Sequence, residues 1–207
     1  MMDNDPTRLI EGWFAKHDDG EFGPSMRVRR SFPYSVVGPT TDGAPIVFTT
    51  KPSVVLAAID QDEVADGPGV IGRYGLPSRT DLDWIGGIIG ARELLFLGDM
   101  DPVDLMVFAW LRSSLCPKQV TCAGVNDVLL EAAGLSATTS ASLPLAASEQ
   151  QSLTLLRKVL PDLGDTVGRE CARMLEQGRK IELEGVRSSR EGVAAIARSV
   201  RFPRTAD

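Results

Sequence analysis

The feature that most limits the possible folds is a short apolar run that ends in a glycine and two aspartates. Residues 94–97 read Leu-Leu-Phe-Leu, a pattern typical of a buried parallel strand, and Gly98 ends the run. Asp99 and Asp101 follow with one residue between them, so an extended backbone directs both side chains to the same side. Open α/β sheets bind ligands at the carboxyl ends of such strands. The pattern predicts an α/β fold with two carboxylates at this position.

Two aspartates placed in this way suit a hard divalent cation. Mg²⁺ prefers one or two carboxylates together with waters and phosphate oxygens, and it stabilises charge in phosphoryl transfer. Asp99 and Asp101 are therefore candidate Mg²⁺ ligands. The alternative is a structural strand-to-helix turn, in which Asp101 caps a helix that begins at Pro102.

Apolar periodicity along the rest of the chain predicts alternating strands and helices. Strands are expected at residues 45–50, 69–72, 94–97 and 119–123, and helices at 53–59, 81–91, 102–113, 148–159 and 165–177. This alternation predicts a mostly parallel central sheet with helices on both faces, because parallel strands need crossover connections. Residues 1–43 are expected to form a short helix at 5–16 and an extended arm, residues 44–147 the α/β core, and residues 148–207 a helical extension packed on that core.

Five segments in the same order resemble one protein family. Residues 98–105, Gly-Asp-Met-Asp-Pro-Val-Asp-Leu, are similar to its Gly-Asp-x-Asp-Pro-x-Gly-(Ile/Leu) signature. The other matching segments are residues 46–55, 69–80, 121–135, and 143–145 together with 174–184. Residues 44–186 thus resemble the Toprim domain of the topoisomerase VI A subunit, of meiotic double-strand-break proteins and of related nuclease subunits. The resemblance implies a Toprim-like, Rossmann-like fold, a role in DNA processing, and a Mg²⁺ site that includes Asp99 and Asp101.

Two positions depart from the family pattern. The first Toprim strand ends in a glutamate that completes the metal and acid–base site, and Thr50 stands at that position here. A hydroxyl is a poor Mg²⁺ ligand and does not shuttle protons near neutral pH. Asp104 replaces a family glycine, and it would be either a third metal ligand or, as we favour, a partner of a helix dipole. Lys51 would pair with Asp99 or Asp101 in place of a metal, or contact a phosphate.

A glycine-containing loop after the second expected strand carries two arginines. Arg73 and Arg79, together with backbone N–H groups, could receive a phosphate or a nucleic-acid backbone. Ordinary turn chemistry is the alternative, and the pattern favours it slightly. The loop matches neither a Walker nor a Rossmann fingerprint, so no nucleotide cofactor is expected.

The nucleophile of the topoisomerase relatives has no clear counterpart. In them a winged-helix domain with a nucleophilic tyrosine precedes the Toprim domain, and residues 1–43 are too few for a winged helix and a linker. Tyr34 and Tyr74 are the two tyrosines of the chain. Tyr34 could be a nucleophile, but a packed or turn position is the simpler interpretation, and Tyr74 lies inside the Gly-Leu-Pro loop.

Charge and composition limit the partners. The net charge of −6 argues against tight, autonomous binding to nucleic acid, although arginines gather at residues 27–30 and 187–204. Glu182 and Glu184 are interpreted as surface carboxylates that pair with Arg179 and Arg187. No apolar run reaches the ~18 residues of a membrane span. We expect a cytoplasmic protein with a protein partner, DNA as a weaker partner, and no membrane contact.

Two functional hypotheses follow. The first is a degenerate Toprim-like module of DNA processing, non-catalytic or regulatory, which acts through protein partners and binds Mg²⁺ weakly. The second is a Mg²⁺-dependent nuclease or phosphotransferase that uses Asp99 and Asp101, with Asp104 as an optional third ligand. The two hypotheses differ in whether the carboxylates hold a metal.

Overall fold

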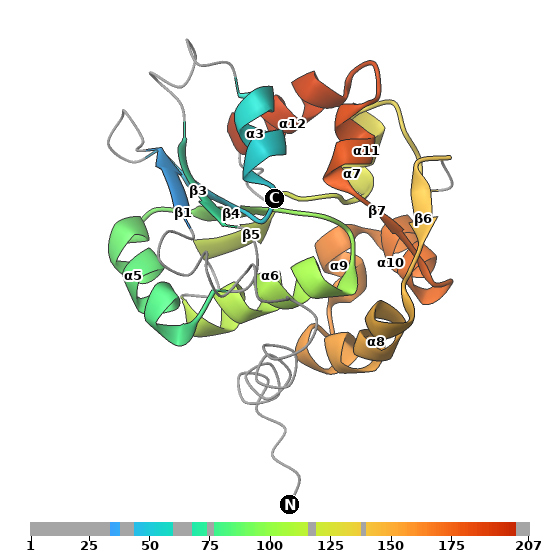
Figure 1. Cartoon of the computed structure of the whole chain (residues 1–207), viewed down its shortest axis with the longest axis horizontal. Helices are drawn as coiled ribbons and strands as arrows, with labels where there is room; N and C mark the ends of the chain where they lie inside the picture. The colour runs from blue at the N-terminus through green and yellow to red at the C-terminus, as the bar shows by residue number, and fades with distance from the viewer. Residues whose placement is uncertain are drawn as a thin grey trace, which may run out of the picture.

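The fold is of the α/β class, with a central β-sheet covered by helices on both faces (Figure 1). The computed structural model describes residues 34–37, 44–59, 68–73, 77–115, 119–137 and 140–201. The helix expected at residues 5–16, most of the expected arm, and Tyr74 lie outside these residues. Of the arm, residues 34–37 form a strand.

The central sheet has the strand order β1-β3-β2-β4-β5. Its strands are β1 (Tyr34–Val37), β2 (Ile46–Thr49), β3 (Gly69–Arg73), β4 (Leu94–Leu97) and β5 (Val120–Cys122). Strands β2 to β5 are parallel, and β1 adds an antiparallel edge strand against β3. The predicted mostly parallel sheet is therefore confirmed, and each of its four expected strands is found where the apolar pattern placed it.

The helices of the described residues cover the two faces of this sheet or pack outside the helices that do. They are α3 (Pro52–Ala58), α5 (Arg79–Ile89), α6 (Pro102–Ser114), α7 (Asp127–Ala132), α8 (Ala147–Val159), α9 (Leu163–Val167), α10 (Arg169–Glu176), α11 (Leu183–Arg187) and α12 (Gly192–Arg201). Figure 1 shows α3, α7, α11 and α12 on one face and α5 and α6 on the other. Helix α8 packs against α6.

The single helix expected at residues 165–177 is in fact two helices, α9 and α10. Gly168 lies between them with a φ of +89°, a conformation that L side chains rarely adopt. A Cβ atom at Gly168 would also lie 2.2 Å from the carboxylate of Asp127. Helical periodicity continues through this position, which is why the sequence pattern missed the break.

The C-terminal part adds a second sheet that the sequence did not predict. Strands β6 (Ser142–Pro144) and β7 (Arg179–Ile181) pair antiparallel. The N–H of Met100 donates to the carbonyl of Ile181 at 3.0 Å. This contact brings the chain around β7 and α11 to the carboxyl end of β4.

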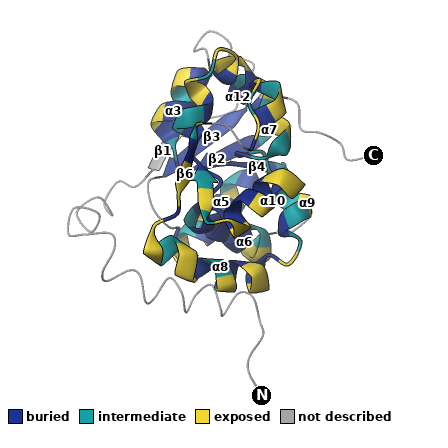
Figure 2. Ribbon diagram, turned by 90° about the vertical axis from the view of Figure 1, so that its right-hand side faces the viewer, coloured by how far each residue is buried: buried dark blue, intermediate teal, exposed yellow. Residues whose placement is uncertain are grey.

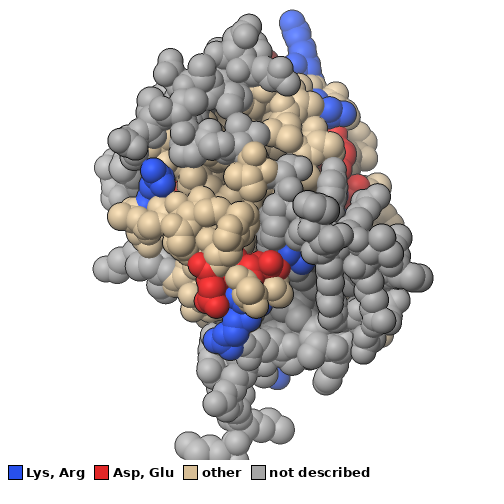
Figure 3. Space-filling model, turned by 60° about the vertical axis from the view of Figure 1, so that its left-hand side comes forward, with Lys and Arg blue, Asp and Glu red and all other residues tan. Residues whose placement is uncertain are grey.

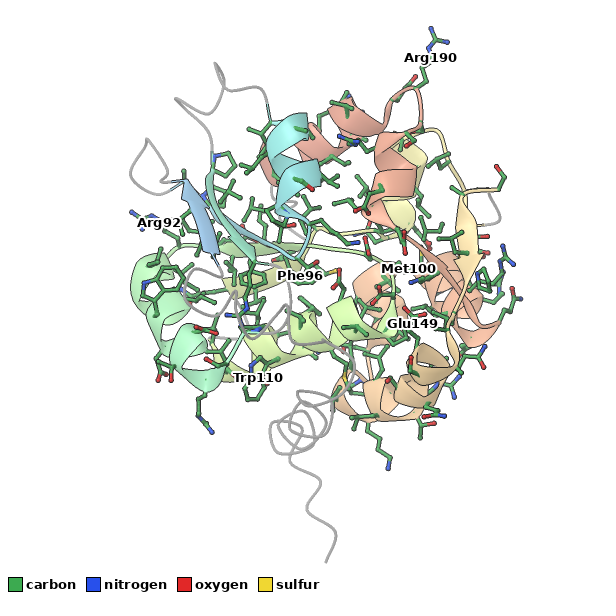
Figure 4. The ribbon with its side chains drawn as sticks, in the orientation of Figure 1. Arg92, Phe96, Met100, Trp110, Glu149 and Arg190 are labelled. Atoms are coloured by element: carbon green, nitrogen blue, oxygen red, sulfur yellow. The ribbon has the colours of Figure 1, made fainter. Side chains whose placement is uncertain are left out.

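The core lies between the sheet and its helices. All four residues of β4 are buried. The ring of Phe96 stacks on that of Phe48, with 6.3 Å between the ring centroids, and packs against the ring of Phe108 on α6, with 5.8 Å between the centroids. Figure 4 labels Phe96 between the sheet and α6, and Figure 2 shows buried strands under helices whose outer faces are exposed. Burial of each side chain of this size contributes about 1.5–3 kcal/mol to the free energy of folding. The packed sheet therefore holds the residues that follow β4 in fixed positions.

Candidate functional site

Asp99, Asp101 and Asp104 gather where β4 ends and α6 begins, and we call these three residues the acidic edge. All three are buried, with 4%, 7% and 7% of their surface exposed. A Cβ atom on Gly98 would lie 2.7 Å from Oδ2 of Asp104 and 2.8 Å from the ring of Phe96, so only glycine allows α6 to approach so closely. Buried carboxylates need partners, and the partners of each one decide what this edge can do.

Asp101 and Asp104 organise the start of α6. Oδ1 of Asp101 accepts the N–H of Asp104 at 2.8 Å, and Pro102 occupies the first turn. Asp101 therefore caps the helix, as the structural alternative for this turn expects. Asp104 lies in the first turn of α6, where a carboxylate also interacts favourably with the helix dipole.

The two departures from the Toprim pattern meet in space. Thr50 follows β2, the neighbour of β4, and its Oγ1 donates to Oδ2 of Asp104 at 2.6 Å. The same oxygen accepts the N–H of Asp99 at 2.7 Å. The carboxylate that the family carries at position 50 is thus absent, while a carboxylate from α6 lies directly beside the hydroxyl that replaces it.

Lys51 supplies a positive charge to Asp99. Its Nζ lies 2.7 Å from Oδ2 of Asp99 and 3.4 Å from both carboxylate oxygens of Glu184 on α11. The N–H of Leu183 donates to Oδ1 of Asp99 at 2.7 Å. Both oxygens of Asp99 therefore already bind protein donors, one charged and one neutral.

Sequence reasoning did not select Lys180 and Glu149, which form a second ion-pair network beside the acidic edge. Nζ of Lys180 on β7 lies 2.8 Å from Oε1 of Glu149 on α8 and 3.2 Å from Oε1 of Glu182. Figure 4 labels Glu149 and Met100 on the side of the molecule where β7 and α11 lie. The alternation of lysine and glutamates at 180, 182 and 184 is the one local signal that could have indicated this network.

The expected partners of Glu182 and Glu184 were wrong. Glu184 pairs with Lys51 and Glu182 with Lys180, whereas Arg179 donates to the side chain and carbonyl of Ser142 on β6. The pairing of β7 with β6 accounts for this, because it brings Arg179 next to β6.

The acidic edge is short of positive charge. Burial, followed by the charge of Asp101, raises the pKa of Asp99 to about 6, although Lys51 and the N–H of Leu183 act in the opposite direction. Burial likewise raises the pKa of Asp101, and burial with the charges of Asp101 and Asp99 raises the pKa of Asp104 well above its usual range. Burial lowers the pKa of Lys51, but the hydrogen bond and charge of Asp99 and the charge of Glu184 raise it by more.

The present arrangement does not fit Mg²⁺ directly. No three His, Cys, Asp or Glu side chains in the described part of the chain are arranged to hold a metal ion. Asp99 is bound by Lys51 and Leu183, and Oδ2 of Asp104 is bound by Thr50 and the N–H of Asp99. A divalent cation would have to displace Lys51 from Asp99. The metal role of Asp99, Asp101 and Asp104 stays a prediction.

The two arginines expected at a phosphate have different surroundings. Arg73 is 8% exposed, and its Nη1 lies 2.5 Å from Oδ2 of Asp81. Asp81 also accepts the N–H of Ser78 at 2.6 Å, so the ion pair joins β3 to the start of α5 and favours the structural alternative for Arg73. Arg79 is exposed at the start of α5. Figure 3 brings this side forward and shows acidic side chains beside basic ones on the described surface. Phosphate contact stays a prediction for both.

Comparison with known proteins leaves the family resemblance as a prediction. The chain matches no protein-family model, and no curated protein matches its sequence. None of the helices in the described residues has the length and apolar character that crossing a membrane requires.

The raised pKa values predict that the protein loses stability as the pH rises. The pKa of Asp99 is about 6 in the folded protein and 3.8 in a free side chain, so the folded state binds the proton more tightly. The free energy of unfolding should therefore fall between about pH 4 and pH 7, as this carboxylate ionises. We expect the Tm to be at least about 4 °C higher near pH 5 than near pH 7.5, which is roughly 1–2 kcal/mol for a chain of this size.

Asp104→Asn tests whether Asp104, whose pKa is also raised by burial, adds to this pH dependence. The amide oxygen can still accept from Thr50 and from the N–H of Asp99, but it carries no charge, so the variant should be more stable near neutral pH and its Tm should change less with pH. Asp162→Asn is the control, because the hydrogen bond from Arg112 lowers the pKa of Asp162. Ionisation of Asp162 therefore changes the stability of the protein only in more acidic solution. His17 is present in every variant, so its contribution to the pH dependence cancels when the Tm values of two variants are compared. A Tm that rises with pH in the parent protein would contradict the assignment.

Proposed function

We propose that this protein is a degenerate Toprim-like module related to the topoisomerase VI A subunit, non-catalytic or regulatory, which acts in DNA processing through protein partners. The observation that carries the proposal is the pair between Lys51 and Asp99, with the N–H of Leu183 on the second oxygen of Asp99. The protein itself occupies the positions on Asp99 that a metal would need. The Toprim and DNA-processing parts of the proposal rest on the sequence resemblance.

The chemistry of the remaining residues agrees with a non-catalytic role. Thr50 stands where the family has its glutamate, and its hydroxyl is engaged with Asp104. A threonine hydroxyl does not titrate near neutral pH, so it cannot serve as a general acid or base there. A carboxylate that is hydrogen-bonded by a hydroxyl and by an amide N–H, as Asp104 is, serves first to hold β2, β4 and α6 together.

One observation favours the second candidate, a Mg²⁺-dependent nuclease or phosphotransferase. The three carboxylates of the acidic edge have raised pKa values, so additional positive charge would be favourable there. In this alternative Mg²⁺ displaces Lys51, and Asp99 and Asp101 hold the ion. The two candidates therefore predict different affinities for the metal.

Calorimetric titration with Mg²⁺ near neutral pH separates the two candidates. We expect no tight site in the parent protein, because the ion must displace the ammonium of Lys51 and has no phosphate ligand to assist it. Lys51→Gln should make the Tm respond more strongly to Mg²⁺, since it removes the competing charge. Lys158→Gln is the matched control, because Lys158 is exposed on α8. Submicromolar binding that Asp99→Asn abolishes would refute the non-catalytic proposal and favour the enzyme.

A further inference from the structure

A cavity whose lining includes no residue of the acidic edge lies beside β5. It has a volume of about 480 Å³ and lies between β5, α7, α9 and the last turns of α12. Figures 1 and 2 show α7 and α12 on the same side of the sheet, and α9 beside α10. Ligand cavities commonly measure ≈ 300–1,000 Å³, so this one is large enough for a small organic molecule.

Apolar groups make up most of the cavity wall. Leu95, Leu129, Val167 and Ala195 line it and are themselves buried. Leu95 comes from β4 and its register partner Thr121 from β5, so the floor of the cavity is the face of the sheet. A ligand would therefore present an apolar ring or chain to this floor.

The polar groups of the cavity offer hydrogen-bond donors. Arg198 is the one basic residue among the described residues that line it, and its guanidinium makes one long hydrogen bond, from Nη2 to the carbonyl of Ala132 at 3.3 Å. Oδ1 of Asn126 accepts the N–H of Leu129 at 2.7 Å. The amide nitrogen of Asn126 makes one long hydrogen bond, to the carbonyl of Cys122 at 3.4 Å. Both side chains can donate further hydrogen bonds.

Of the two acidic residues that line the cavity, Asp127 is bound by protein donors. The two carboxylate oxygens of Asp127 accept the N–H groups of Glu170 and Cys171 at 3.0 and 2.9 Å, so its charge is used at the start of α10. Asp165 and Arg198 are both exposed to solvent.

We propose that this cavity binds a small organic acid, with its apolar body on the sheet and its carboxylate paired with Arg198. Arginine binds a carboxylate through two parallel N–H groups, and the guanidinium of Arg198 has these groups available. The site would give a module without catalysis a way to respond to a small molecule. The proposal does not depend on the proposed function, because no residue of the acidic edge lines the cavity.

The test compares 1-naphthoate with its neutral analogue 1-naphthamide by calorimetric titration of the full chain. We expect naphthoate to bind with a Kd of millimolar or below, naphthamide to bind about tenfold more weakly, and Arg198→Gln to weaken naphthoate about tenfold. Ser199→Phe should abolish binding of both by filling the cavity, and it can fold because Ser199 is not fully buried and its Oγ bonds only within α12. Arg187→Gln is the control, since Arg187 is exposed on α11 outside the cavity.

Any of four results would overturn the proposal. Three of them are saturable naphthoate binding that Arg198→Gln leaves unchanged, equal binding of the acid and the amide, and absence of naphthoate binding in the parent protein. Loss of binding in Arg187→Gln to the same extent as in Arg198→Gln would also overturn it, because it would assign the effect to net charge.

Discussion

Lys51→Met is expected to destabilise the protein by about 3 kcal/mol near neutral pH, because it leaves the buried carboxylate of Asp99 without its cation. The side chain of Lys51 is 25% exposed, which places the effect at the lower end of the range for broken buried pairs. Denaturant unfolding gives the free energy of unfolding directly. The loss should be smaller near pH 5, since the pKa of Asp99 is about 6 and its carboxylate is then mostly protonated.

A second substitution shows whether the loss comes from the charge of Asp99. Adding Asp99→Asn to Lys51→Met removes the unpaired charge, so the double variant should recover most of the lost stability. Lys158→Met is the control for removing a lysine, because Lys158 is exposed. An equal loss at both pH values, or no recovery in the double variant, would mean that Lys51 stabilises the protein by packing alone.

Thr50→Glu is expected to cost roughly 3 kcal/mol or more, because it places a carboxylate next to the buried carboxylate of Asp104. Like charges in a buried site repel unless a cation enters. Mg²⁺ should therefore raise the Tm of this variant more than it raises the Tm of the parent protein, by mass action on the folded state. Thermal unfolding with and without Mg²⁺ measures the difference.

Two further variants separate charge from size at this position. Thr50→Gln introduces a side chain of the same length without charge, so it should be destabilised less and should not respond to Mg²⁺. Thr50→Glu with Asp104→Gly rebuilds the family pattern at both positions, and removing the neighbouring carboxylate should restore part of the stability lost in the single variant. Equal Mg²⁺ responses in Thr50→Glu and in the parent protein would show that a glutamate at position 50 does not form a cation site.

The variants at positions 50 and 51 address one question, namely what neutralises the acidic edge. The ammonium of Lys51 interacts with Asp99, Asp104 and Glu184, whereas Lys180 is the cation that acts on Asp101. Because Lys51 is covalently part of the chain, its binding to Asp99 needs no free ligand and no loss of translational freedom. A protein-borne cation is therefore a strong competitor of a weakly held Mg²⁺.

Local signals in the sequence were sufficient for the sheet and for the place of the aspartates. The apolar run of residues 94–97 predicted β4 with its bounds, because a strand buried on both faces needs four consecutive apolar side chains. Asp101 and Pro102 predicted the start of α6, because capping depends only on neighbouring residues. The break at Gly168 was missed, since the helical pattern continues across it, and the positive φ of Gly168 and the closeness of Asp127 show why glycine is required.

Tertiary structure alone decided the partners of those aspartates. Thr50 and Asp104 are 54 positions apart, Asp99 and Leu183 are 84 apart, and Lys51 and Glu184 are 133 apart. Each of these contacts depends on how α6 and α11 pack against the carboxyl end of the sheet, and periodicity and capping patterns extend over only a few residues. The sequence by itself therefore determined that carboxylates stand at the end of β4. Packing of distant segments determined that Lys51 and the N–H of Leu183 bind Asp99 and that Thr50 binds Asp104, because a buried carboxylate takes its partners from the groups that the fold brings near.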